Sequence, residues 1–152
     1  MIFSLQLSVY GGRWGREKEN GMSNGFRDLV VWQKSMQLAV EIYELTKEFP
    51  REEIYGLTSQ MRRSAVSIPS NIAEGQGRVN PAEFRQFVSI ARGSNCELQT
   101  QLELALALKF GNPATLDLAQ QLSEEVRKML YGLLSSLKQP SKRTNMELQT
   151  LN

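Results

Sequence analysis

Apolar residues recur at alternating spacings of three and four along most of this chain, and short breaks containing proline or glycine interrupt the pattern. These spacings gather apolar side chains on one stripe of an α-helix, which must then pack against other helices. No segment rich in valine, isoleucine and threonine shows the two-residue alternation of a β-strand. The pattern therefore predicts an all-α fold, an antiparallel up-down four-helix bundle with short connections.

The first two predicted helices span about residues 28–48 and 53–76. Pro50 separates them, because the residue before a proline avoids the helical conformation. The apolar stripe of the first helix is Val31, Ser35, Leu38, Ile42, Leu45 and Phe49. The stripe of the second helix is Leu57, Met61, Ala65, Ile68 and Ile72.

The third and fourth predicted helices span about residues 80–110 and 113–138. Asn80 suits the N-cap and Pro81 the first helical position of the third helix. The main stripe of the third helix is Phe84, Val88, Ala91, Leu98, Leu102 and Ala105. The stripe of the fourth helix is Leu122, Val126, Met129, Leu133 and Leu137.

Pro69 lies inside the second predicted helix and predicts a kink there. A proline at this position removes the hydrogen bond to the carbonyl of Ala65. Polar side chains beside the proline are expected to bond to the backbone carbonyls that it frees, with contact to a ligand or partner as the alternative. These side chains are Ser67, Ser70 and Asn71.

Three glycines carry further expectations. Gly75 and Gly77 are expected to end the second helix. The sequence Gly-Gln-Gly-Arg that begins at Gly75 lacks a preceding strand and a Lys-Ser/Thr pair, so it does not predict a phosphate-binding loop. Gly93 falls in the middle of the third helix, where a glycine often permits the close approach of another helix.

The chain of 152 residues is long enough for one domain, which we place at residues 26–138. We expect residues 1–25 to be disordered. We expect residues 1–21 to be a translated leader or an over-long gene start, because the sequence MSNGFRDL that begins at Met22 looks like a natural N-terminus. Residues 139–152 are expected to form a flexible tail. The longest apolar runs are shorter than the ~20 residues that a membrane-spanning helix needs, so no membrane contact is predicted.

The sequence contains no histidine and a single cysteine, Cys96. Histidine is the commonest general base at neutral pH and the commonest metal ligand in proteins. A lone cysteine cannot form an internal disulfide and has no partner to activate it as a nucleophile. We therefore expect no catalytic residues, no metal, no cofactor and no enzymatic activity, and a reducing cytoplasmic location.

Arginines on the second and third helices are the candidate nucleic-acid-binding residues. The body between Phe26 and Pro140 contains 13 basic and 13 acidic residues, so any basic site must come from local clustering. Antiparallel packing of these two helices would gather several guanidinium groups, which grip phosphates bidentately. The candidates are Arg62, Arg63, Arg78, Arg85 and Arg92. The alternative is pairing, within the chain or between subunits, with Glu52, Glu53, Glu83, Glu97 or Glu103.

The first helix carries a second apolar stripe, which one bundle does not need to bury. An extra stripe containing tryptophan and tyrosine is typical of an oligomer interface. The alternative is looser packing within the chain. The stripe contains Trp32, Met36, Ala39 and Tyr43.

Four parts of the sequence stand out together: FRDLVVWQKSMQLA (26–39), YGLTSQMRRSAVSIPSNIAEGQGR (55–78), FRQFVSIARGSNCELQTQLELA (84–105) and the GNP break at 111–113. With them the chain resembles the bacterial four helix bundle protein family, known also as the 23S rRNA intervening-sequence proteins. The stretch SQMRRSAVSIPSNIAEG is the most specific, because a proline within a helix that also carries serine and asparagine is rare. The resemblance covers residues 26–138.

The resemblance implies four-helix protomers that assemble as a ring-like homopentamer and have no enzymatic activity of their own. Some members are encoded inside insertions of large-subunit ribosomal RNA genes. A related branch contains the accessory variability determinants of diversity-generating retroelements. The resemblance implies that proteins of that branch bind a reverse transcriptase and RNA or DNA through a basic surface.

Three functions follow as hypotheses. The first is a non-enzymatic pentameric scaffold associated with RNA. The second is an accessory subunit that holds a reverse transcriptase and its template RNA, although the neutral body weighs against it. The third is a structural interaction module that binds no nucleic acid.

Overall fold

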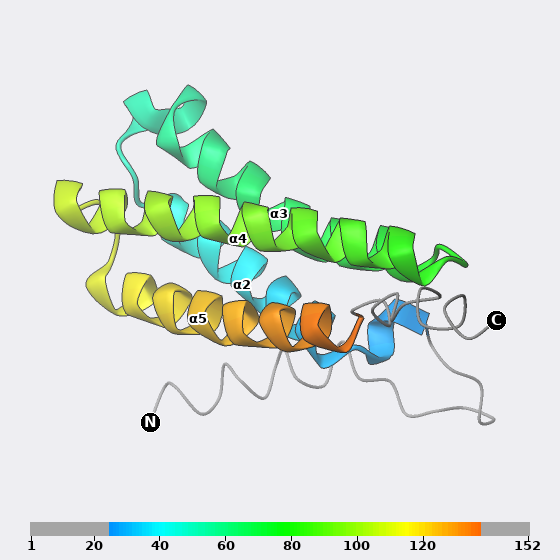
Figure 1. Ribbon diagram of the computed structural model, residues 1–152. Helices are drawn as coiled ribbons and strands as arrows, with labels where there is room; N and C mark the ends of the chain where they lie inside the picture. The colour runs from blue at the N-terminus through cyan, green and yellow to red at the C-terminus, as the bar shows by residue number, and fades with distance from the viewer. Residues whose placement is uncertain (1–24, 138–152) are drawn as a thin grey trace, which may run out of the picture.

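The computed structural model describes residues 25–137, and every regular element in this range is helical (Figure 1). The predicted all-α class and the four-helix bundle are confirmed. The elements are η2 (Gly25–Asp28), α2 (Val30–Thr46), η3 (Arg51–Tyr55), α3 (Leu57–Gln76), α4 (Pro81–Leu108) and α5 (Pro113–Ser136). The predictions for the leader and for the C-terminal tail concern residues outside the described range.

Each long helix packs against its neighbours in sequence, and α2 closes the bundle against α5 (Figure 1). The pair α3 and α4 makes the most extensive contact. Short connections join the helices, as the up-down order requires. The antiparallel arrangement and the kink at Pro69 stay predictions.

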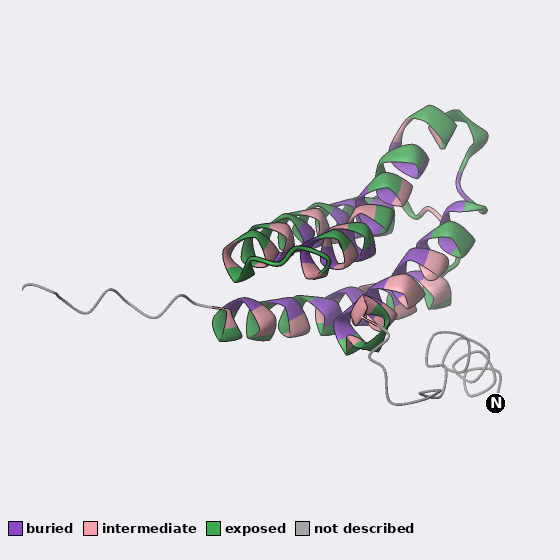
Figure 2. Ribbon diagram, turned by 90° about the vertical axis from the view of Figure 1, so that its right-hand side faces the viewer, coloured by how far each residue is buried: buried purple, intermediate pink, exposed green. Residues whose placement is uncertain are grey.

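Most residues of the predicted stripes lie in the core, and Figure 2 shows the buried faces of the helices turned toward one another. The exceptions are only partly buried against the core: Phe84, Met129, Leu133 and Leu137. Ile42, Met61, Leu98 and Val126 contribute one fully buried side chain from each long helix. The second stripe of α2 is partly core as well. Trp32 is only 6% exposed and its ring centroid lies 5.3 Å from that of Phe26. Its prediction as an interface residue is therefore corrected, because its apolar surface is already buried within the chain.

Asparagine caps and following prolines begin α4 and α5, as predicted for α4. The Oδ1 atom of Asn80 accepts a hydrogen bond from the backbone N of Ala82 at 2.8 Å. Asn112 accepts from the backbone N of Ala114 at 2.8 Å and of Thr115 at 3.3 Å. These bonds satisfy N–H groups that have no partner inside a helix.

The second long helix begins later than predicted, at Leu57 instead of residue 53. The segment Arg51–Tyr55 forms a separate 3-10 helix, and Gly56 leaves the helical conformation. The carboxylate of Glu53 accepts a hydrogen bond from the backbone N of Leu57 at 2.9 Å. A side chain from the preceding turn therefore caps α3.

Gly75 does not end α3; it is buried inside the helix. A Cβ atom at this position would lie 2.6 Å from the Cβ of Phe87 and 2.9 Å from the Cδ2 of Phe84. Gly75 is thus the point of close approach between α3 and α4, and Gly77 is the C-cap. The prediction for Gly93 is wrong within the described chain, since a Cβ there would meet no atom within 4 Å.

Helix α3 continues through Pro69, whose side chain is buried. Ser70 donates a hydrogen bond from Oγ to the carbonyl of Val66, and Asn71 donates from Nδ2 to the carbonyl of Ser67, each at 2.8 Å. These carbonyls belong to residues after Ala65, whereas the carbonyl to which the proline cannot donate is that of Ala65 itself. Within the described residues the side chains of Ser67, Ser70 and Asn71 therefore do not make the predicted bond to the freed carbonyl.

Candidate nucleic-acid interface

Two adjoining hollows lie where α2 ends and α3 begins, and we call them together the α2/α3 groove. Their volumes are about 360 and 500 Å³. Ile54, Thr58 and Arg62 line both of them. The first is also lined by Thr46, Lys47, Phe49, Pro50 and Arg51. The second is also lined by Tyr43, Ser59, Arg63, Val66 and Ser67.

All charged side chains that line the α2/α3 groove are cations: Lys47, Arg51, Arg62 and Arg63. Lys47 pairs at 2.7 Å with Glu44, which does not line the groove. Within residues 25–137, Arg51 and Arg63 form no ion pair. The groove thus has a positive potential while the body as a whole is neutral.

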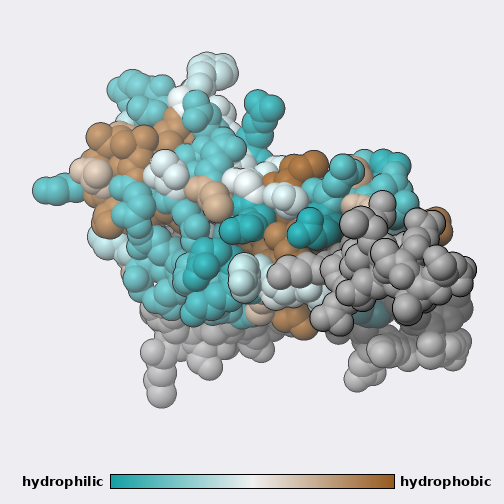
Figure 3. Space-filling view, in the orientation of Figure 1, coloured by the Kyte–Doolittle hydropathy of each residue, from teal (hydrophilic) through white to brown (hydrophobic). Residues whose placement is uncertain are grey.

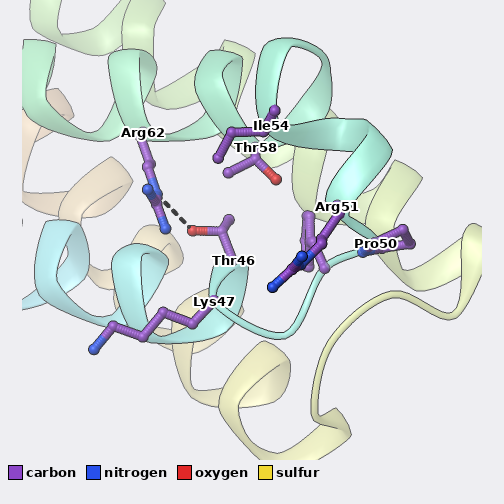
Figure 4. Close-up of a pocket in the computed structure, with 8 residues that line it drawn as sticks. Thr46, Lys47, Pro50, Arg51, Ile54, Thr58 and Arg62 are labelled. Atoms are coloured by element: carbon purple, nitrogen blue, oxygen red, sulfur yellow. Dashed lines mark hydrogen bonds between the residues drawn. The ribbon is translucent and has the colours of Figure 1, made fainter.

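Arg62, on α3, is held in place by two residues of α2. Its Nε donates a hydrogen bond to Oγ1 of Thr46 at 2.9 Å, and its Cζ lies 4.6 Å from the centroid of the Tyr43 ring. Thr46 in turn donates to the carbonyl of Ile42 at 2.7 Å. Figure 4 shows Arg62 and Arg51 pointing into the first hollow, whereas Lys47 extends away along α2. A guanidinium held in this way loses little freedom when it binds an anion.

Neutral side chains complete the lining of the groove. Thr58, Ser59 and Ser67 contribute hydroxyl groups. Tyr43 and Ile54 are large side chains that are 42% and 51% exposed. Cations, hydroxyl groups and an exposed aromatic ring are the groups that contact phosphates and unpaired bases in single-stranded nucleic acids.

The arginines predicted to bind nucleic acid do not all lie at one site. Only Arg62 and Arg63 line the groove. Arg78 pairs with Glu74 at 3.1 Å and its Cζ lies 5.3 Å from the Phe87 centroid, which is pairing within the chain. Arg85 and Arg92 are exposed on α4 and line no part of the groove.

Sequence reasoning missed Lys47 and Arg51 as groove residues. Both flank the break at Phe49-Pro50, where two packed helices must come close together. A cation on each side of a tight helix connection was the available signal. Two residues remain candidates for the predicted oligomer interface. Tyr43 is exposed, and Met36 is half-buried against the core.

The sequence model of the 23S rRNA-intervening sequence proteins matches residues 27–132, which include the whole groove. The chain belongs to this family. It is also similar to a protein of unknown function from the S23 ribosomal protein family of Bacteroides thetaiotaomicron, known from a crystal structure. That similarity has a TM-score of 0.64 and 27% identity, and it covers 69% of this chain and 98% of the other. No curated protein matches the sequence.

Two kinds of feature are absent from residues 25–137. None of the described helices is long and apolar enough to cross a membrane. No group of three acidic or cysteine side chains in the same range is arranged to hold a metal ion.

Proposed function

We propose that this protein is a non-enzymatic cytoplasmic scaffold that binds RNA in the α2/α3 groove and assembles into a homo-oligomer, with a pentamer as the expected state. One observation carries the proposal: four cations line the groove and no carboxylate does. Lysine and arginine bind phosphates and release the counterions of the nucleic acid. The absence of histidine from the sequence supports binding instead of catalysis.

Single-stranded RNA is the form that suits the groove. The exposed ring of Tyr43 and the side chain of Ile54 offer surfaces on which an unpaired base can stack. A duplex keeps its bases stacked inside and could contact only the cations. The family name, which refers to sequences that interrupt 23S rRNA, supports RNA as the nucleic acid.

The test compares two double variants with equal loss of charge. Arg51→Gln with Arg63→Gln removes two unpaired groove cations, and Arg85→Gln with Arg92→Gln removes two exposed cations outside it. We expect the first to weaken retention of single-stranded RNA and to make the negative slope of log K against log salt shallower by about 1.4, while the second changes little. Equal effects of the two double variants, or no effect of the first, would contradict the assignment.

Self-assembly is supported by an exposed apolar stripe on α4. Ile90, Leu104 and Leu108 are 52%, 47% and 48% exposed and share a helix face with Gly93. The space above Gly93 is open, so a partner helix can come close to the backbone there. Figure 3 shows hydrophobic areas among hydrophilic ones on the face where α4 lies in front, one of them near the end of that helix.

Light scattering measures the assembly directly. We expect a mass of about five 17.2-kDa chains for the parent protein and a smaller mass for Leu104→Glu. Glu103→Gln changes the neighbouring residue by one charge and serves as the control. A monomeric parent protein, or an unchanged mass for Leu104→Glu, would contradict assembly through α4.

A further inference from the structure

A third hollow, of about 460 Å³, lies between α3 and α4 and is lined by residues with polar or charged side chains. We call it the α3/α4 hollow. Its lining residues are Gln60, Arg63, Ser64, Ser67, Ser94 and Glu97. Most ligand pockets are lined mainly by apolar side chains. A hollow lined by polar and charged side chains favours a polar ligand over a hydrophobic one.

Ser64 gives the first sign that this hollow takes a ligand. The residue is 3% exposed, and its Oγ atom has no hydrogen-bond partner within residues 25–137. A buried hydroxyl without a partner costs free energy, so such groups are rare in folded proteins. Because Ser64 lines the hollow, a molecule bound there can provide the missing partner.

Opposite charges that do not pair give the second sign. Arg63 and Glu97 line the same hollow, yet they form no ion pair with each other or with another residue of the described chain. The Nε2 atom of Gln101 donates a hydrogen bond to Oε1 of Glu97 at 3.3 Å and so orients this carboxylate. The hollow thus presents one cation and one anion at separate points of its wall.

The rest of the wall is already satisfied. The hydroxyl groups of Ser67 and Ser94 bond to each other at 2.9 Å, and Asn71 donates from Nδ2 to Oγ of Ser67 at 3.0 Å. The bond between Ser67 and Ser94 links α3 to α4. The buried Oγ of Ser64 lacks a partner within the described residues, and the exposed side chains of Arg63 and Glu97 offer a ligand opposite charges.

We propose that the α3/α4 hollow binds a small zwitterion of the α-amino-acid class. The ligand carboxylate accepts hydrogen bonds from Arg63 and Ser64, and the ligand ammonium donates to Glu97. A simple anion is complementary to Arg63 alone and a simple amine to Glu97 alone, whereas a zwitterion is complementary to both charges. The amide of Gln60 and the serine hydroxyls favour a small polar side chain.

Titration calorimetry of the full chain with three matched probes tests the ligand class. L-asparagine carries both charges, succinamate lacks the ammonium and 3-aminopropanamide lacks the carboxylate. We expect L-asparagine to bind and each single-charge analogue to bind about tenfold or more weakly, because each loses a hydrogen bond to a charged group. L-serine and L-glutamine test the side chain in the same way.

Variants place the binding in the hollow. Glu97→Gln and Ser64→Ala should each lose binding of the zwitterion, whereas Glu83→Gln and Arg92→Gln, which alter exposed residues of α4 outside the hollow, should retain it. Thermal melts of all four variants show that the fold is intact. Binding that survives in Glu97→Gln overturns the proposal.

Two other outcomes also overturn the proposal. If none of the three amino acids binds, the hollow holds only water. If the two single-charge analogues bind as tightly as L-asparagine, the site does not select zwitterions. Arg63 lines both the α2/α3 groove and the hollow, so the two proposals are separated by single variants: Glu97→Gln leaves the cations of the groove intact and Arg51→Gln leaves the hollow intact.

Discussion

At the residue scale, the glycines show how differently one residue type is used in this bundle. Replacing Gly75 by alanine places a methyl group 2.6 Å from the Cβ of Phe87, so we expect the free energy of unfolding to fall by about 1–3 kcal/mol. Gly132 on α5 has open space instead. Its replacement by alanine should raise the free energy of unfolding by up to about 1 kcal/mol. Urea denaturation measures both, and changes of the same sign would contradict the close approach at Gly75.

Glu41 gives a prediction about pH. Burial raises the pKa of its carboxyl, and the nearby carboxylate of Glu44 raises it further. The folded state therefore binds this proton more tightly than the unfolded state, and stability is gained as the pH falls through the raised pKa. Glu41→Gln should raise the melting temperature at neutral pH, and the gain should vanish once Glu41 is protonated in both states. The exposed Glu48→Gln is the control, and an equal gain there would assign the effect to net charge.

Individual residues also show what the sequence could and could not predict. The periodicity identified the core because burial follows helix geometry. It misassigned Trp32, since a pattern on one helix does not show how much surface its neighbours and the preceding turn cover. The hydroxyl of Ser64 could not be recognised as buried and unpartnered, because that depends on the packing of α4 against α3.

At the element scale, the helix starts were predictable where a cap and a proline occur together. The side chain of Asn112 satisfies two backbone N–H groups of α5. Asn112→Ala should therefore lower the free energy of unfolding by about 1 kcal/mol, as measured by urea denaturation. Asn112→Asp retains a side-chain oxygen at the cap and should restore most of the loss. Equal losses in the two variants would show that the cap is not the cause.

The start of α3 was less predictable for the opposite reason. Glu53 reads as the first turn of a helix because acidic residues favour helix N-termini. Its carboxylate instead caps Leu57 from a separate turn, and Gly56 divides the two elements. The break at Gly56 matters for function, since the 3-10 helix before it carries Arg51 and Ile54 into the α2/α3 groove.

At the scale of the whole molecule, the neutral net charge of the body did not predict the cationic α2/α3 groove. A body with equal numbers of acidic and basic residues predicted no strong preference for nucleic acid, yet all four charged residues that line one groove are cations. Two of them, Lys47 and Arg51, flank a connection, and the other two come from α3. Only the fold brings these segments together, so the sequence could supply candidates such as Arg62 and Arg63 but not the complete set.

Assembly should increase RNA affinity, because a homo-oligomer presents one α2/α3 groove per chain. Binding of a second groove to the same strand is intramolecular and gains from a high effective concentration. We expect RNA long enough to reach two grooves to bind at least about tenfold more tightly than RNA that fills one. Leu104→Glu, which is expected to reduce assembly, should remove this dependence on length and leave the affinity for short RNA unchanged. If Leu104→Glu weakens the binding of short and long RNA equally, Leu104 contacts the RNA itself. If the parent protein binds short and long RNA with the same affinity, the grooves do not act together.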